Sequence, residues 1–75
     1  MNRQRRKELA RAMELIGEAR SIIENCCEEE QDAFDNMPEG IQASERGEQM
    51  EEYISTMEDV ISNIEDAESG LEEIA

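Results

Sequence analysis

Apolar side chains recur every seven residues along the C-terminal third of the chain, and this repeat limits the fold more than any other feature. Its first and fourth positions are apolar throughout, with Met50, Tyr53, Met57, Val60, Ile64, Ala67, Leu71 and Ile74. Ile54 and Ile61 add a third apolar position. Three apolar positions in seven make a stripe that is typical of a helix packed against more than one neighbour. The repeat therefore predicts a long helix within a bundle.

The first half of the chain carries the same period. Its apolar residues form three columns, which are Leu9, Ile16 and Ile23; Ala12, Ala19, Cys26 and Ala33; and Met13, Cys27 and Phe34. A further apolar pair, Leu15 and Ile22, lies to one side of these columns. A single antiparallel partner helix cannot cover so wide an apolar surface, so we expect something else to cover this pair.

The break between the two patterned segments predicts a hairpin connection. Pro38 disfavours helix at the residue before it, and Gly40 loosens the backbone. Ser44 is suited to cap a following helix. We expect one all-α domain over residues 1–75, an antiparallel two-helix hairpin with helices at about 3–35 and 45–73 and a loop at about 36–44.

A two-helix hairpin leaves part of each apolar stripe without a neighbour. Two hairpins packed face to face bury both stripes in a four-helix bundle, and twofold dimers are the commonest closed assemblies. The sequence thus predicts a homodimer with an interface that contains Leu9, Met13, Leu15, Ile16, Ile22, Ile23, Ile54, Met57, Ile61 and Ile64.

The chain is strongly acidic, with 21 acidic and 7 basic residues and a net charge of −14. This balance argues against direct binding to nucleic acid or to an anionic membrane and favours a basic partner. Residues 1–20 carry a net charge of +3, whereas residues 21–75 carry −17. Folding at the loop should bring these ends together, so we expect Arg3, Arg5, Arg6, Lys7 and Arg11 to pair with Glu65, Asp66, Glu68, Glu72 and Glu73.

The composition also argues against enzymatic chemistry and against a cofactor or metal. Histidine and tryptophan are absent, so the commonest general base is missing. Cys26 and Cys27 are neighbours that cannot staple distant segments, and we expect them to be reduced thiols in a cytoplasmic protein. The acidic cluster from Glu28 to Glu39 lacks the residue order of a calcium-binding EF-hand loop. No signal peptide or membrane span is predicted.

The carboxylates form a ladder that has two interpretations. One is a solvated surface that keeps the protein soluble. The other is nucleic-acid mimicry, in which rigid carboxylates occupy a basic groove on a DNA- or RNA-binding protein, although a repeat of about 10.5 Å does not match the 3.4 Å spacing of phosphates. The residues predicted to bind such a partner are Glu28, Glu29, Asp32, Asp35, Glu51, Glu52, Glu58, Asp59, Glu65 and Asp66.

The connection and the segment after it carry a family resemblance. The stretch Phe34-Asp35-Asn36-Met37-Pro38-Glu39-Gly40-Ile41-Gln42, followed by Ser44-Glu45-Arg46-Gly47-Glu48 and the acidic repeats, resembles small acidic proteins encoded by phages and prophages of Gram-positive bacteria. The resemblance covers nearly the whole chain and supplies no catalytic residues. It implies an inhibitor of a host factor or of a host defence system.

Two functions follow as hypotheses. The first is a non-enzymatic inhibitor that blocks a basic, nucleic-acid-binding host protein through its carboxylates. The second is a structural or assembly protein whose apolar stripe packs into a larger helical complex. Reversing the charges of the ladder should abolish the first activity, whereas polar residues at Leu15 and Ile22 should abolish the second.

Overall fold

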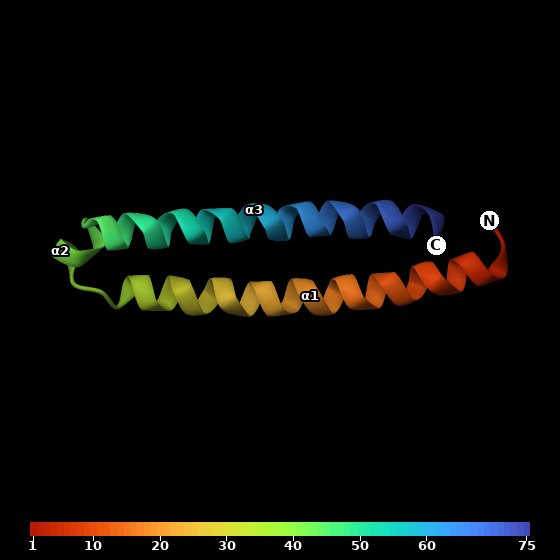
Figure 1. Cartoon of the computed structure of the whole chain (residues 1–75), viewed down its shortest axis with the longest axis horizontal. Helices are drawn as coiled ribbons and strands as arrows, with labels where there is room; N and C mark the ends of the chain where they lie inside the picture. Colours follow the sequence, from red (N-terminus) through yellow and green to blue (C-terminus); the bar gives the residue numbers. More distant parts are fainter.

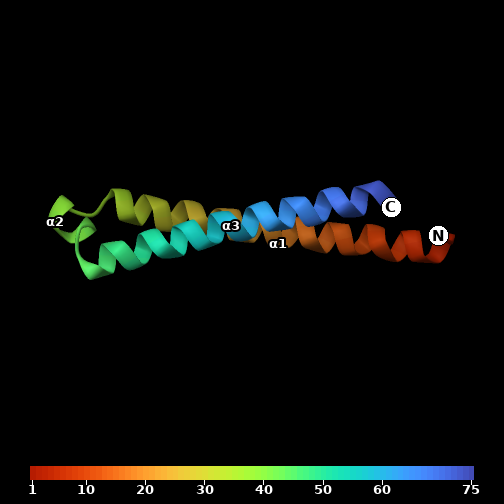
Figure 2. The ribbon, with the colours of Figure 1, turned by 90° about the horizontal axis from the view of Figure 1, so that it is seen from above.

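The computed structural model describes all 75 residues as two long antiparallel helices joined by a short helical turn (Figure 1). Helix α1 spans Arg3–Asp35, α2 spans Glu39–Gln42 and α3 spans Glu45–Ile74. The molecule is a rod of 58 × 14 × 13 Å. Both termini lie at the end away from α2, as two perpendicular views show (Figures 1 and 2). The predicted all-α hairpin is confirmed.

Side-chain caps set where the two long helices begin. Asn2 precedes α1, and its Oδ1 accepts a hydrogen bond of 2.8 Å from the backbone N–H of Arg5. Ser44 precedes α3, as the sequence predicts, and its Oγ accepts a bond of 3.5 Å from the N–H of Gly47. Each cap satisfies one of the backbone donors that a helix leaves unpaired in its first turn.

The connection contains α2, one helical turn within the loop predicted at about 36–44. Pro38 has a φ of −59°, and its carbonyl accepts hydrogen bonds from the N–H groups of Ile41 at 2.9 Å and Gln42 at 3.0 Å. Gln42 Nε2 donates to the carbonyl of Phe34 at 2.8 Å and ties the turn to the end of α1. The fixed φ of proline disrupts the helix before it but also suits the residue that starts a new turn. The connection between the long helices therefore contains a helical turn that begins directly after Pro38.

Gly47 allows the first turn of α3 to approach the connection closely, and it is one of two buried residues. A Cβ atom at this position would overlap the carbonyl oxygen of Gln42, 2.5 Å from its carbonyl carbon and 2.7 Å from its Cα. These are backbone atoms, so no side-chain rotation relieves the overlap. The tight return of the chain therefore depends on a residue without a side chain.

The long helices pack along one seam whose members are spaced alternately by three and four residues. Its members on α1 are Leu9, Met13, Ile16, Arg20, Ile23, Cys27, Glu30 and Phe34, and those on α3 are Gly47, Met50, Ile54, Met57, Ile61, Ile64, Glu68 and Leu71. Ile54 is 5% exposed and forms the centre of this thin core. The seam uses two of the three apolar positions of the repeat. The third, which contains Tyr53 and Val60, stays exposed.

The predicted pairing of the basic N-terminus with the acidic end of α3 was wrong. A single ion pair joins the two long helices, between Arg20 and Glu68. A Cβ on Gly17 would lie 3.8 Å from a carboxylate oxygen of Glu68, so these two residues lie level with each other along the rod. In this register the first two turns of α1 extend beyond the end of α3 (Figure 1). The basic side chains of those turns therefore have no α3 carboxylate beside them.

Candidate functional site on two faces of the hairpin

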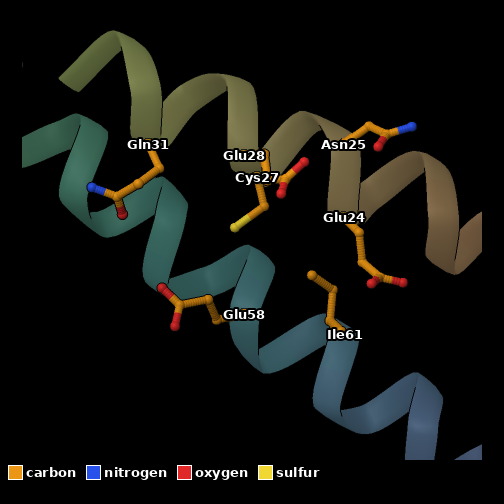
Figure 3. Close-up of a pocket in the computed structure, with 7 residues that line it drawn as sticks. All are labelled: Glu24, Asn25, Cys27, Glu28, Gln31, Glu58 and Ile61. Carbon is orange, nitrogen blue, oxygen red and sulfur yellow. The ribbon is translucent and has the colours of Figure 1, made fainter. Parts of the chain in front are cut away.

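An open groove runs between α1 and α3 on one side of the hairpin (Figure 3). Its volume is about 440 Å³, and its lining residues are Glu24, Asn25, Cys27, Glu28, Gln31, Glu58 and Ile61. We call this side the acidic face and define it by Glu24, Glu28 and Glu58. No basic side chain lines the groove, so its negative charge is neutralised only where Arg20 reaches Glu24 from the edge.

The thiol of Cys27 lies in this groove and points toward α3 (Figure 3). Its Sγ lies 3.9 Å from the carbonyl oxygen of Ile54, within the range of a weak S–H donor. Partial burial raises the pKa of Cys27, and the negative charges of Glu58 and Glu28 raise it further. Because the thiolate is the reactive form, this environment makes Cys27 a poor nucleophile at neutral pH.

Arg20 is a seam residue that the sequence analysis missed. Its Nε donates to Glu68 Oε1 at 2.6 Å, and its Nη1 donates to Glu24 Oε1 at 2.7 Å. The hydrogen bond to Glu68 and the charge of that carboxylate raise the pKa of Arg20. The sequence does indicate a seam position for Arg20, because it stands midway between Met13 and Cys27 in a column of residues spaced by seven that is otherwise apolar. The guanidinium thus occupies a core position and meets a carboxylate at a core position of α3.

All ten carboxylates that the sequence predicts as a partner surface are exposed, and none of them forms an ion pair. Seven-residue spacing places Glu51, Glu58 and Glu65 together on the acidic face. The carboxylates that follow each of them by one residue point away from α1. Glu29 stands seven residues after Ile22 and belongs to a different side of α1 from the groove. The predicted set therefore does not form one surface.

The exposed apolar side chains gather on the opposite side of the hairpin. On α3, Glu51 and Glu58 stand on one flank of the seam, and the tyrosine column stands on the other flank, with Tyr53, Val60, Ala67 and Ile74. On α1, Glu24 and Gln31 line the groove, and the alanine column stands on the far flank, with Ala12, Ala19, Cys26 and Ala33. The flanks of α1 and α3 that line the groove lie on the same face of the hairpin. The alanine column and the tyrosine column, on the two remaining flanks, therefore lie together on the opposite face.

Leu15 and Ile22 border the alanine column and complete what we call the apolar face. Its large side chains are strongly exposed, with Ile22 at 63%, Tyr53 at 52%, Ile74 at 51%, Leu15 at 47% and Val60 at 38%. Only Met1 and Ile41 are large exposed apolar residues elsewhere. Exposed apolar side chains that gather on one side of a protein make that side a candidate site of association.

The residues predicted as an oligomer interface therefore divide into two groups. Eight of them lie in the seam of a single hairpin, namely Leu9, Met13, Ile16, Ile23, Ile54, Met57, Ile61 and Ile64. Leu15 and Ile22 remain outside the seam and uncovered, as expected of a pair that one partner helix cannot cover. The tyrosine column belongs with this pair, and its position on the same side follows only from the three-dimensional arrangement.

A comparison with known protein families, with curated proteins and with solved structures finds no match for this chain. Neither long helix contains a segment that is long and apolar enough to cross a membrane. No group of three or more carboxylates or thiols is arranged to hold a metal ion. Function must therefore be argued from the two faces themselves.

Proposed function

We propose that the protein is a non-enzymatic acidic binding protein that pairs with a second copy through its apolar face and presents its carboxylates outward. The observation that carries this proposal is the segregation of side chains, with exposed large apolar residues on one side of the hairpin and the carboxylates of the acidic face on the other. Pairing two apolar faces gives the homodimeric four-helix bundle predicted from the sequence. The acidic faces then become the outer surface of the assembly.

The partner that fits this outer surface is a basic protein. Residues 21–56 contain eleven acidic side chains and one basic side chain, Arg46, so the half of the rod nearest α2 carries a net charge of −10. A rigid surface of this sign attracts and orients a positively charged groove, such as that of a DNA- or RNA-binding protein. The resemblance to phage-encoded acidic proteins supports a host factor or a defence protein in the host cytosol as this partner.

An assembly role is the second candidate, and the exposure of Ile22 favours it specifically. At 63%, this isoleucine has the highest exposed fraction of the large apolar side chains of the two long helices, so a covering helix would bury much of it. In this second function a helix of another protein, rather than a second copy, covers the apolar face. The acidic face then serves only for solubility.

Capture from a nuclease-treated bacterial lysate tests the first function against the second. The native chain is compared with a charge-reversed variant in which Glu51, Glu52, Glu58 and Asp59 are replaced by lysine. We expect a basic nucleic-acid-binding protein to be retained by the native chain, released by salt and displaced by duplex DNA. The charge-reversed variant should not retain it, because salt-sensitive attraction depends on these carboxylates.

A matched control carries the same number of reversals outside the ten predicted partner residues, at Glu8, Glu14, Glu18 and Glu73, all of which are exposed. Both variants have a net charge of −6 in place of −14. The proposal predicts that the control still retains the partner. Equal binding by both variants, or capture only of an apolar partner that resists salt, contradicts the acidic-face function and favours assembly.

A further inference from the structure

The apolar face has one midpoint that both helices share. The alanine column and the tyrosine column each contain four residues spaced by seven. Gly17 lies level with Glu68 along the rod. With this alignment, Ala12 lies level with Ile74 and Ala33 lies level with Tyr53, to within about one residue. The two columns therefore start and stop together. The two columns therefore coincide with their own outline when the hairpin is turned end over end.

Charge along the rod distinguishes the two ways in which a second copy can dock on this face. The half nearest α2 carries −10, and the half that contains both termini, residues 1–20 and 57–75, carries −4. If the second copy docks in the same direction, the half with a net charge of −10 lies against the equivalent half of the other copy, which also carries −10. Docking end over end places −10 against −4 and lays residues 3–20 of α1, with a net charge of +3, against residues 21–35 of the other α1, with −6. The second arrangement reduces repulsion and adds attraction.

The side of the rod that carries the apolar face also has a size that fits a second copy. A rod of 58 × 14 Å presents about 800 Å² on one side. Specific interfaces of standard size bury about 800 Å² on each partner. Because the apolar columns share a midpoint with each other, docking end over end overlaps them over their whole length.

We infer that the apolar face binds a second copy docked end over end, with the two α2 turns at opposite ends of the bundle. In this arrangement α1 lies against α1 of the other copy, and α3 lies against α3. Ile22 lies at the twofold axis and meets its own counterpart, while the ends of the two tyrosine columns meet, so that Tyr53 covers Ile74. This inference rests on the dimer of the proposed function and specifies its geometry.

Pulsed electron paramagnetic resonance with a spin label near α2 tests the arrangement. The label is attached at Gly40→Cys, a position where an added side chain meets nothing within 4 Å, in a chain that also carries Cys26→Ala and Cys27→Ala. Gly40 lies about 18 residues from the midpoint near Ile22, so the two labels of an end-over-end dimer are separated by about 50 Å at 1.5 Å per residue. Circular dichroism verifies that the labelled chain keeps its helix content.

A second label at Ser62→Cys, near the midpoint, reports whether a dimer forms in either orientation. It should give a distance below about 40 Å, because the bundle is only a few helices wide. A distance below about 30 Å at Gly40, together with the short distance at Ser62, overturns the end-over-end arrangement and leaves the dimer intact. The absence of any dipolar signal at both positions overturns the dimer itself, whatever the acidic face binds.

Discussion

Replacing Gly47 with alanine should destabilise the hairpin, although alanine is the better helix former. Helix propensity alone favours the substitution by about 1 kcal/mol. The new Cβ would lie 2.5 Å from the carbonyl carbon of Gln42 and would overlap its oxygen, so the connection must move. Overpacking of this kind costs about 1–3 kcal/mol. Movement of Gln42 also breaks its hydrogen bond to Phe34, worth about 1 kcal/mol, which leaves a net loss of about 1–3 kcal/mol.

Gly70→Ala is the matched control for this experiment. Gly70 also lies in α3, but a Cβ there meets no atom within 4 Å. Its replacement should therefore stabilise the protein by about 0.5–1 kcal/mol. Urea unfolding followed by circular dichroism at fixed protein concentration measures both free energies of unfolding. Stabilisation by Gly47→Ala equal to that of Gly70→Ala would refute the close approach between α3 and the connection.

The core and the groove lead to further predictions. Ile54→Ala should lower the free energy of unfolding by about 2–4 kcal/mol because Ile54 is 5% exposed. Ile41→Ala, at an exposed position, should change it by less than about 0.5 kcal/mol. Equal losses for the two variants in urea unfolding would contradict the position of the core. In a Cys26→Ala background, Cys27 should react with iodoacetamide more slowly in the folded chain than in urea at pH 8, because its raised pKa lowers the thiolate fraction. Glu58→Gln should speed this reaction by removing one of the charges that raise the pKa, and an unchanged rate would count against the groove geometry.

The sequence was sufficient for the elements of the fold because their signals are local. The seven-residue repeat identifies both long helices, and a capping serine marks the start of α3 at Ser44. The position of Leu15 and Ile22 outside the contact between the two helices could also be predicted from the sequence. It depends only on how wide an apolar stripe one partner helix can cover. These features need no knowledge of how the helices are aligned.

Features that depend on helix register could not be predicted in the same way. The basic residues of the first turns of α1 were expected beside α3, but the register leaves those turns beyond its end. The division of the wide α3 stripe into a seam and an exposed tyrosine column likewise depends on how α3 is rotated against α1. The seam position of Arg20 was not predicted, because a charged residue interrupts an apolar column there. Only its contact with Glu68 explains why it belongs in the seam.

The mass of the native chain in solution tests the central claim most directly. Sedimentation equilibrium at micromolar concentration should give about 17 kDa, twice the 8.6 kDa of one chain. Ile22→Glu places charge at the centre of the apolar face, and this variant should sediment as a single chain of 8.6 kDa with its helix content retained. A native chain that remains at 8.6 kDa over this concentration range would contradict the pairing of two apolar faces.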